Sequence, residues 1–326
     1  MLSLEDAATV LAPLAVAKGL VLAVSGGADS VALMLLAAHW PGRPPVIVAT
    51  VDHGLRPDSR REAETVGLWA AALGLRHCLL TWQGDKPATR IQEKARAARY
   101  ALLVQCAKDH GADAIATGHH ADDQAETILF RLVKGSGMAG LAGMQAVMRR
   151  DDVTHFRPLL DIAKTGLIDV CARQNHPWFE DPSNRNEFFA RPHLRRIGGL
   201  LAHEGFGRDA LVRLGKRAAR AEAALETMAR HANTGGLTSK ALADMPEEIA
   251  LRVIAEAILG ITGKTVPLRL ERLERMVMGL RQAIAARTCF ASSLGGVLVR
   301  LDAAGLLHLR PEPQRRRGKP PPPPAI

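Results

Sequence analysis

The run from Val21 to Trp40 constrains the fold more than any other stretch of the chain. An apolar segment, Val21–Val24, leads through Ser25-Gly26-Gly27-Ala28-Asp29-Ser30 directly into a second apolar segment that begins at Val31. Glycine allows backbone N–H groups to turn toward an anion, and a helix N-terminus adds the positive end of its dipole. The run therefore predicts a strand, a phosphate-binding loop and a helix. A tight strand–helix turn without a ligand is the alternative.

Strands and helices alternate after this run. Apolar or β-branched segments predict strands at 45–51, 77–82 and 113–117, and amphipathic segments predict helices at 62–74 and 89–111. Such alternation is typical of an α/β fold, in which a parallel sheet is covered by helices on both faces. The carboxyl ends of parallel strands share one edge, so the Ser25 loop, Asp52 and His119 are expected to meet there.

Length and charge favour a two-domain protein with a polyanionic partner. The chain has 326 residues, of which 47% are hydrophobic, and its formal net charge is +10. These values predict about two domains, a real core and binding to nucleic acid. Aromatic residues make up only 4%, which disfavours a base-stacking sheet. No apolar run approaches the ~18–20 residues of a membrane span, and the N-terminus lacks a signal-peptide layout, so a cytoplasmic protein is expected.

The pattern changes in the second half of the chain. We expect residues 1–205 to form the sheet-containing domain and 206–310 to form a smaller, mainly α-helical domain. The latter begins with a long predicted helix, from Phe206 to Asn233, and has strands only near its end, at 296–301 and 306–310. The last residues, 311–326, contain a basic triplet and five consecutive prolines, which predict a disordered or polyproline II tail.

Cysteines contribute no recognisable motif. Cys78, Cys106, Cys171 and Cys289 lie far apart in the sequence, without a Cys-x-x-Cys pair. This scatter disfavours a disulfide framework or a zinc site. We expect four reduced thiols, mostly buried.

Acidic residues gather at the start of the helix that follows the strand at 113–117. Asp122, Asp123 and Glu126 fall within about one turn and on roughly one side. Clustered carboxylates beside a phosphate site suggest Mg²⁺ ligation or recognition of a cationic substrate. Capping of the helix by one aspartate, with the other acids solvated, is the alternative. One of the adjacent His119 and His120 is expected to contact phosphate or sugar.

Three further segments carry weaker signals. Asp52 ends a predicted strand and would suit a hydroxyl or amino group, and Arg56 would suit phosphate, although Asp-His-Gly is also common in turns. Glycines between 135 and 143 predict a flexible loop, either over the substrate or as a plain linker. Trp178 and Phe179 stand beside acids, as in a base pocket, although Asx and proline turns also account for this segment locally.

Basic residues are concentrated between 185 and 217. This stretch contains eight arginines and lysines against three acidic residues. Such an excess suggests a track for a nucleic-acid backbone, and a solvated helix face is the alternative.

Taken together, these motifs resemble one family. The Ser25–Ser30 loop is neither a Walker A loop nor a dinucleotide-binding loop, and it is similar to the Ser-Gly-Gly-x-Asp-Ser loop of the PP-loop ATP pyrophosphatases. Over about residues 20–200 the ordered set of motifs resembles the tRNA(Ile)-lysidine synthetases. The residues that carry this resemblance are Ser25–Ser30, Val51–Arg56, Thr117–Thr127, Gly135–Gly137 with Gly140-Leu141, Arg157–Leu160 and Glu180–Asn184. These enzymes attach free lysine to C2 of the wobble cytidine of an isoleucine tRNA with the CAU anticodon, after ATP has adenylated the base.

The resemblance implies a role for each motif, with ATP and Mg²⁺ as cofactors. ATP would be bound by Ser25, Gly26, Gly27, Ala28, Asp29 and Ser30, together with Asp52, Arg56 and His119. The catalytic residues would be Asp29, Asp123, Glu126 and Arg96. Asp29 and Asp123 would hold the metal, Asp123 and Glu126 the metal or the lysine ammonium, and Arg96 ATP or the base. The tRNA would contact Arg191, Arg195, Arg196 and Arg213.

Two features depart from the family pattern. Pro192 stands where the family usually has Asn, and the extra domain of longer members, which grips the acceptor end of the tRNA, has no match here. Two other functions were weighed. Thiolation of tRNA usually needs Cys-x-x-Cys, and a tRNA-binding protein without activity would not need the intact loop and acids. The sequence does not distinguish a monomer from a dimer.

Overall fold

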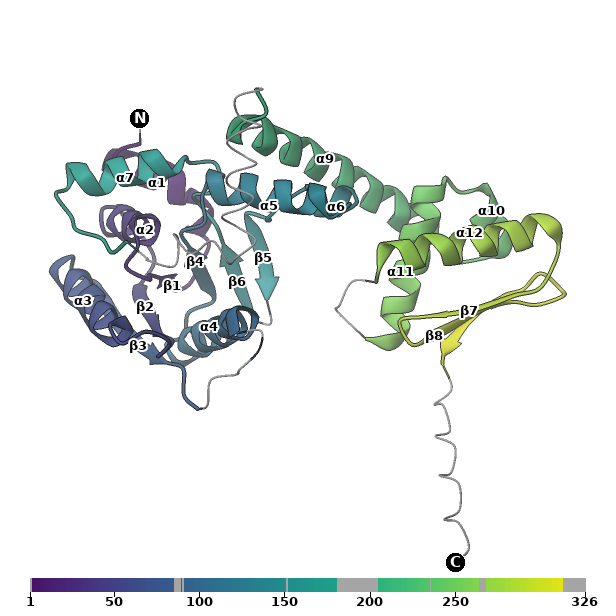
Figure 1. Ribbon diagram of the computed structural model, residues 1–326, viewed down its shortest axis with the longest axis horizontal. Helices are drawn as coiled ribbons and strands as arrows, with labels where there is room; N and C mark the ends of the chain where they lie inside the picture. The colour runs from purple at the N-terminus through teal and green to yellow at the C-terminus, as the bar shows by residue number, and fades with distance from the viewer. Residues whose placement is uncertain are drawn as a thin grey trace, which may run out of the picture. The chain divides into compact units, whose positions relative to one another are not determined.

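The computed structural model describes residues 2–84, 89, 91–150, 152–180, 205–234, 236–263 and 268–312. The chain divides into two compact units, Met1–Ala219 and Arg220–Ile326, which are drawn in Figure 1. The division falls within one long helix, α9 (Arg208–Asn233). The boundary expected at residue 205 stays a prediction, and the predicted tail lies outside the described residues from residue 313 onward.

A six-stranded sheet forms the centre of the first unit. Its strand order is β3-β2-β1-β4-β6-β5, and it is parallel except for β5, which runs antiparallel to β6. The strands are β1 (Leu20–Ala23), β2 (Val46–Asp52), β3 (Arg76–Thr81), β4 (Ala114–Thr117), β5 (Val147–Arg150) and β6 (Val153–Phe156). The predicted α/β fold with a parallel sheet is confirmed.

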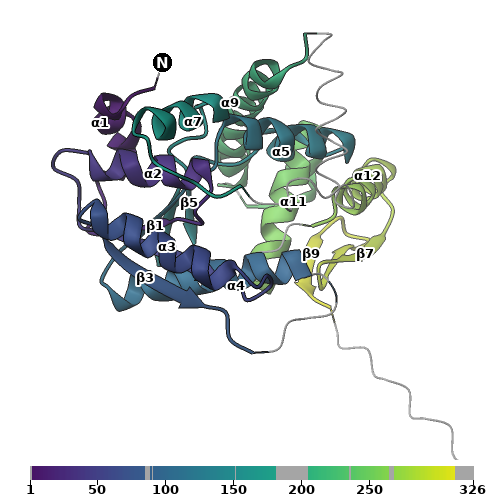
Figure 2. The same cartoon turned by 60° about the vertical axis from the view of Figure 1, so that its left-hand side comes forward.

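Helices cover both faces of this sheet. The described residues of the first unit include the short 3₁₀ helices η1 (Leu4–Asp6) and η2 (Ala12–Leu14) and the helices α1 (Ala7–Leu11), α2 (Ala28–Ala38), α3 (Ser59–Ala72), α4 (Ile91–Asp109), α5 (Ala121–Val133), α6 (Met138–Leu141) and α7 (Lys164–Arg173). Helices α1, α2 and α7 lie side by side in both Figure 1 and Figure 2.

Strand β1 is apolar at every position because its side chains enter two cores. Leu20 and Leu22 belong to a core with residues of α1, α2, α3 and α7. Val21 and Ala23 belong to a second core, which includes Leu103 of α4. A strand that is buried on both faces shows a continuous apolar run instead of alternation, and this run is the signal from which the sequence predicted the strand.

Helix α2 begins at Ala28, three residues before the start expected from the sequence. Gly27 is its N-cap, so Asp29 and Ser30 lie in the first turn, where a carboxylate complements the helix dipole. The β5–β6 hairpin was not predicted. Each of its strands has four residues, which is too short for a periodic pattern to show.

The second unit combines helices with a small antiparallel sheet. After the end of α9 it contains α10 (Ser239–Asp244), α11 (Glu247–Thr262), α12 (Leu270–Ala286), β7 (Phe290–Leu294), β8 (Val297–Leu301) and β9 (Leu307–Pro311), with the strand order β7-β8-β9. Ile254, Val277 and Val299 join α11, α12 and β8 in its core. The sequence predicted β8 and β9 and missed β7, whose Ala291 and Ser293 are exposed. Within the described residues, none of the helices combines the length and apolar character of a membrane span.

Replacing Leu33 by alanine tests the core around α2. Leu33 is fully buried, whereas Leu68 on α3 is 72% exposed. We expect Leu33→Ala to lower the free energy of unfolding by about 2–5 kcal/mol and Leu68→Ala by less than about 0.5 kcal/mol. All four tryptophans lie in the first unit, so tryptophan fluorescence during urea unfolding reports on that unit. Equal losses in the two variants would contradict the assigned core.

Candidate active site

The loop between β1 and α2 is folded onto itself. The Ser30 hydroxyl donates to the carbonyl oxygen of Gly27 at 2.9 Å and accepts from the backbone N–H of Ser25 at 3.1 Å. Gly26 has a φ of +90°, which residues with a side chain rarely adopt. The loop therefore presents a fixed, curved backbone at the N-terminus of α2, an arrangement suited to binding an anion.

Phe179 closes this loop from outside. Its N–H donates to the carbonyl oxygen of Gly26 at 2.8 Å, and its ring stacks on Trp69 with the ring centroids 5.0 Å apart. A Cβ atom on Gly26 would lie 2.6 Å from the Phe179 ring. Glycine is thus required at position 26 both for its backbone angle and for this close contact.

The loop after β4 packs against the first turn of α2. A Cβ atom on Gly118 would lie 2.8 Å from the carbonyl oxygen of Asp29. This close approach brings His120 to Asp29: the Nε2 atom of His120 lies 3.4 Å from Asp29 Oδ2 and 3.4 Å from Asp123 Oδ2. His120 is also the N-cap of α5, where its backbone N–H donates to Asp123 Oδ2 at 3.2 Å and its Nδ1 lies 3.4 Å from the backbone nitrogen of Asp123.

The carboxylates around His120 raise the pKa of its ring. Burial alone would lower the pKa of His120, but the hydrogen bond to Asp29 and the charges of Asp123, Asp29 and Asp122 outweigh it and raise the pKa. Burial also raises the pKa of Asp123, and repulsion from Asp29 and Glu126 adds to it against the attraction of His120. The cluster of Asp29, His120 and Asp123 therefore favours retention of a proton.

The Oδ1 atom of Asp29 is available to a ligand. This oxygen is buried and has no hydrogen-bond partner among the described residues, although buried carboxylate oxygens usually have one. Asp123 and Glu126 are half-buried on neighbouring turns of α5. Carboxylate oxygens are the ligands that Mg²⁺ prefers, so these residues fit the metal expected from the sequence.

Asp122 has a different task from the other two acids of α5. Its Oδ2 accepts the backbone N–H of Lys164 at 2.8 Å, at the start of α7, and its Oδ1 lies 3.8 Å from Arg208. Asp122 thus anchors α5 to α7. Of the two roles that the sequence left open, capping of α5 falls to Asp123, whose Oδ2 accepts the backbone N–H of His120. Ligand binding by Asp123 and Glu126 stays a prediction.

A cavity of about 480 Å³ opens beside the loop, at the carboxyl ends of β1 and β2. Its lining includes Ser25, Gly27, Val51, His53, Arg56, Glu62, Arg99, Phe179 and Glu180. Its volume falls in the range of roughly 300–1,000 Å³ that is typical of small-molecule sites. The cavity and the loop together have the size and the polarity that a nucleotide needs.

Asp52 supports the wall of the cavity. Its Oδ1 accepts the N–H of Gly54 at 2.9 Å and the hydroxyl of Ser59 at 2.6 Å. Burial opposes its charge, but these hydrogen bonds and nearby Arg60 lower its pKa. Asp52 is not among the described lining residues, whereas Arg56 is, with its Nη2 2.7 Å from Glu62.

His119 belongs to a second polar cluster. Its Nδ1 lies 2.7 Å from the Thr117 hydroxyl, which also lies 2.9 Å from His155 Nε2. Burial, with the charges of Arg157, Arg96, Arg99 and His155, lowers the pKa of His119 to about 3, so the ring is neutral. Arg96 lies over the Tyr100 ring, 5.2 Å from its centroid.

The glycine-rich stretch after α5 is pinned, contrary to the flexible loop expected from its composition. It contains α6, and Arg131 Nη1 donates to the carbonyl oxygens of Gly140 and Gly143 at 2.9 and 2.7 Å. The Gln124 amide also exchanges two hydrogen bonds with the backbone of Met144. These side chains on α5 satisfy backbone groups that a loose loop would leave to water.

The structure brings together the Ser25–Ser30 loop, Asp123 and the cavity containing Arg56. It places Asp52 behind the wall of the cavity, His119 in the second polar cluster and Arg96 over the Tyr100 ring. Arg191, Arg195 and Arg196 lie outside the described residues, and Arg213 is exposed on α9.

Sequence reasoning did not single out His53, Arg99 or the contact of His120 with Asp29. The spacing Arg96–Arg99 is one helical turn and was a usable signal, but adjacency alone could not show which histidine turns toward α2.

The proton on His120 predicts a pH-dependent stability. Because its pKa in the folded protein is raised above the ordinary 6.5, the stabilisation is fully present below 6.5 and is lost as the pH rises through the higher, folded value. We therefore expect the stability advantage of the wild type over His120→Asn to be greatest in mildly acidic buffer and to shrink with rising pH. Urea unfolding monitored by tryptophan fluorescence measures it. An advantage that grows with pH would contradict a charged His120.

Comparisons with known proteins agree with this geometry. Residues 4–198 match the PP-loop domain family. The tRNA(Ile)-lysidine synthase of Methylobacterium sp. (strain 4-46) is 50% identical over 316 residues, which cover 93% of this chain and 92% of that protein. The enzyme of the same name from Bradyrhizobium sp. (strain BTAi1) is 43% identical, with 97% and 96% covered.

A solved structure shows the same fold. The U34-tRNA thiolase NcsA from Methanococcus maripaludis superposes with a TM-score of 0.56 at 16% identity, covering 65% of this chain and 78% of that one. This likeness concerns the fold alone. The identity to the curated relatives extends over nearly the whole chain, and the protein therefore belongs to the tRNA(Ile)-lysidine synthase family of PP-loop proteins.

Proposed function

We propose that this chain ligates free lysine to C2 of the wobble cytidine of an isoleucine tRNA with the CAU anticodon, converting ATP to AMP and pyrophosphate. Membership of the family supports the enzyme class. The observation that carries the proposal for this chain is the meeting of the phosphate loop with the Asp29–His120–Asp123 cluster. Adenylation followed by attack of an amine requires such a combination of anion binding and acidic groups.

ATP fits between the cavity and the loop. The adenosine would occupy the cavity beside His53 and Phe179, and the phosphates would lie against Ser25–Ser30. Backbone N–H groups and the dipole of α2 would offset their negative charge there. Asp29 and Asp123 would hold Mg²⁺, which supplies charge neutralisation for the phosphates when bound.

The reaction has two displacement steps. The C2 oxygen of cytidine attacks the α-phosphorus of ATP, and pyrophosphate leaves with the electron pair of the broken P–O bond. The lysine ε-amine then attacks C2, the C2–O bond breaks, and AMP leaves while the amine nitrogen gives up a proton. Catalysis in both steps rests on positioning and charge neutralisation. The rigid Ser25–Ser30 backbone supplies the positioning of the phosphates.

Asp123 and Glu126 are the residues that we expect to meet the lysine side chain. Both carboxylates lie on one side of α5, next to a cluster that already favours a positive charge on His120. An ε-ammonium must lose a proton before it can attack C2. With Asp123 holding Mg²⁺, Glu126 is the carboxylate left to accept that proton.

The first part of α9 offers basic side chains for the tRNA backbone. Arg208 and Lys216 are tied to acids of the same unit, with Lys216 2.8 Å from Asp161. Arg213 is exposed between them. We expect Arg213, with Arg191, Arg195 and Arg196, to contact phosphates of the tRNA. Because tRNA, ATP and lysine meet in the cytoplasm, the reaction is expected there.

The Asp29 carboxylate allows a direct test of the chemistry. Wild-type protein with ATP, Mg²⁺, labelled lysine and CAU-anticodon isoleucine tRNA should place label in the tRNA and release pyrophosphate. Asp29→Asn keeps the shape but removes the charge, and we expect pyrophosphate release to fall at least about 100-fold with tRNA binding retained. The control is Glu64→Gln, an exposed acid on α3, which should behave as wild type.

Two outcomes would contradict the proposal. Wild-type protein that leaves the tRNA unlabelled would refute the reaction itself. Near-normal turnover by Asp29→Asn would show that the loop and its acid have been assigned wrongly.

Arg213→Gln tests the tRNA track separately. Loss of one phosphate contact should raise the KM for tRNA and reduce the slope of log affinity against log salt by about 1, so the difference from wild type should shrink as salt increases. The control is Arg76→Gln, which removes an exposed arginine at the start of β3, the end of the strand remote from the cavity. If both substitutions changed the KM for tRNA and the salt slope equally, Arg213 would contribute only nonspecific surface charge.

A further inference from the structure

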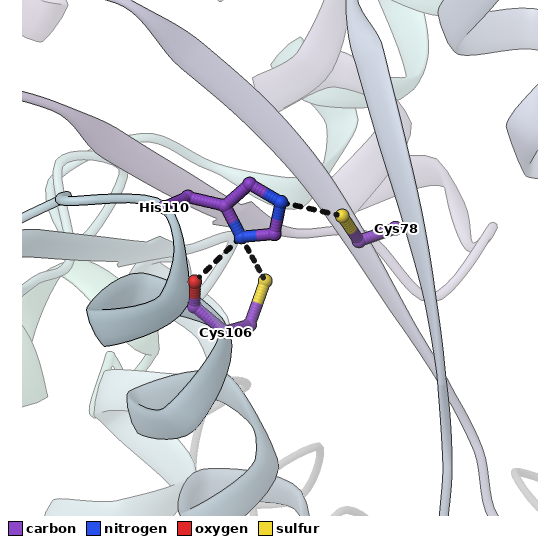
Figure 3. Close-up of side chains that lie close together, drawn as sticks. All are labelled: Cys78, Cys106 and His110. Carbon is purple, nitrogen blue, oxygen red and sulfur yellow. Dashed lines mark hydrogen bonds between the residues drawn. The ribbon is translucent and has the colours of Figure 1, made fainter.

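Cys78, Cys106 and His110 come together on the face of the sheet that α4 covers, as Figure 3 shows. Cys78 lies in β3, Cys106 lies in the last turn of α4, and His110 follows that helix directly. One ligand atom from each residue lies within 4.8 Å of the other two. The sequence suggested no metal site among the cysteines, because the spacing of 28 residues between Cys78 and Cys106 does not reveal that a strand and a helix end meet.

The His110 ring is oriented by its own backbone surroundings. Its Nδ1 lies 2.9 Å from the carbonyl oxygen of Cys106, and because a carbonyl can only accept, Nδ1 carries the hydrogen. Nε2 then presents a lone pair, 3.5 Å from Cys78 Sγ. Histidines that bind metals in proteins are commonly held by such a donation to a backbone carbonyl.

The distance between the donor atoms of Cys78 and His110 matches a tetrahedral metal site. Bond lengths of about 2.3 Å to sulfur and about 2.0–2.1 Å to nitrogen, at a tetrahedral angle, place the two donors about 3.5 Å apart. The observed distance from Cys78 Sγ to His110 Nε2 is 3.5 Å. Cys106 Sγ lies 3.9 Å from Nδ1, the nitrogen that does not bind, so the Cys106 side chain has to turn toward Nε2 and Cys78 to complete the site. Two thiolates and an imidazole favour zinc over hard cations such as Mg²⁺ or Ca²⁺.

The three side chains also leave a route for an ion. Cys106 is buried, Cys78 is partly buried and His110 is exposed, so an ion can enter beside the ring and keep a water molecule as its fourth ligand. Burial is the main reason that the pKa of Cys106 is raised to about 12. The Cys106 thiol therefore holds its proton until an ion binds, when the proton passes to water.

We propose that Cys78, Cys106 and His110 bind one Zn²⁺ ion, which joins the end of α4 to β3. The site lies at the opposite end of α4 from Arg96 and Arg99, and neither cysteine nor His110 is among the described residues that line the cavity. Its role is thus to stabilise the fold, and the proposal does not depend on the proposed reaction.

Titration of the full-length protein tests this site. Reduced protein, freed of metal by a chelator, is titrated with Zn²⁺ by calorimetry and with Co²⁺ by absorption. We expect one ion per chain, a thiolate-to-cobalt charge-transfer band and a higher Tm with Zn²⁺. Cys78→Ser and His110→Asn should weaken binding on the order of 100-fold or more. Cys289→Ser, at an exposed cysteine outside the cluster, should leave it unchanged.

The variants keep the proposal open to refutation. His110 is exposed, so His110→Asn tests the site even where Cys78→Ser does not fold, and circular dichroism of each metal-free variant shows whether it is folded. Equal Zn²⁺ affinity of the wild type and His110→Asn would overturn the proposal. Cobalt bound without a thiolate band would overturn it as well.

Discussion

The close packing of Gly118 against the first turn of α2 is the contact on which the candidate site depends. Only a residue without a side chain allows the backbone after β4 to come so near to the carbonyl oxygen of Asp29. The approach places the imidazole of His120 beside the Asp29 carboxylate, which would otherwise lose solvation without gaining a partner. The loops that follow the neighbouring strands β1 and β4 are thereby brought together. The acidic start of α5 consequently lies beside the phosphate loop.

Charge balance explains how the Asp29–His120–Asp123 cluster can accept cations in turn. Asp29, Asp122 and Asp123 surround a single imidazole, and their combined charge keeps its proton. A metal ion or an ammonium group bound to the same carboxylates would offset their charge and thereby lower the pKa of His120 again.

Local patterns account for what the sequence revealed. The loop, the buried strands β2 and β4 and the acids of α5 each lie within one short segment, so their spacing is visible without a fold. The surroundings of His119 and Asp122 depend on residues that the chain brings from elsewhere, His155 for His119 and Lys164 for Asp122. The hydrogen-bond partners of Asp52 are local, but Asp-His-Gly is common in turns and does not reveal them. The cysteines follow the same rule, because Cys78 and Cys106 meet only once β3 and α4 have packed.

The bond from Phe179 to Gly26 has a consequence for biosynthesis. The loop stands near the start of the chain, but the N–H group and the ring that close it belong to a residue about 150 positions later. Translation proceeds from the N-terminus, so a nascent chain can form β1, α2 and much of the sheet while the loop still lacks its outer wall. The nucleotide site is consequently completed late, when most of the first unit has already left the ribosome.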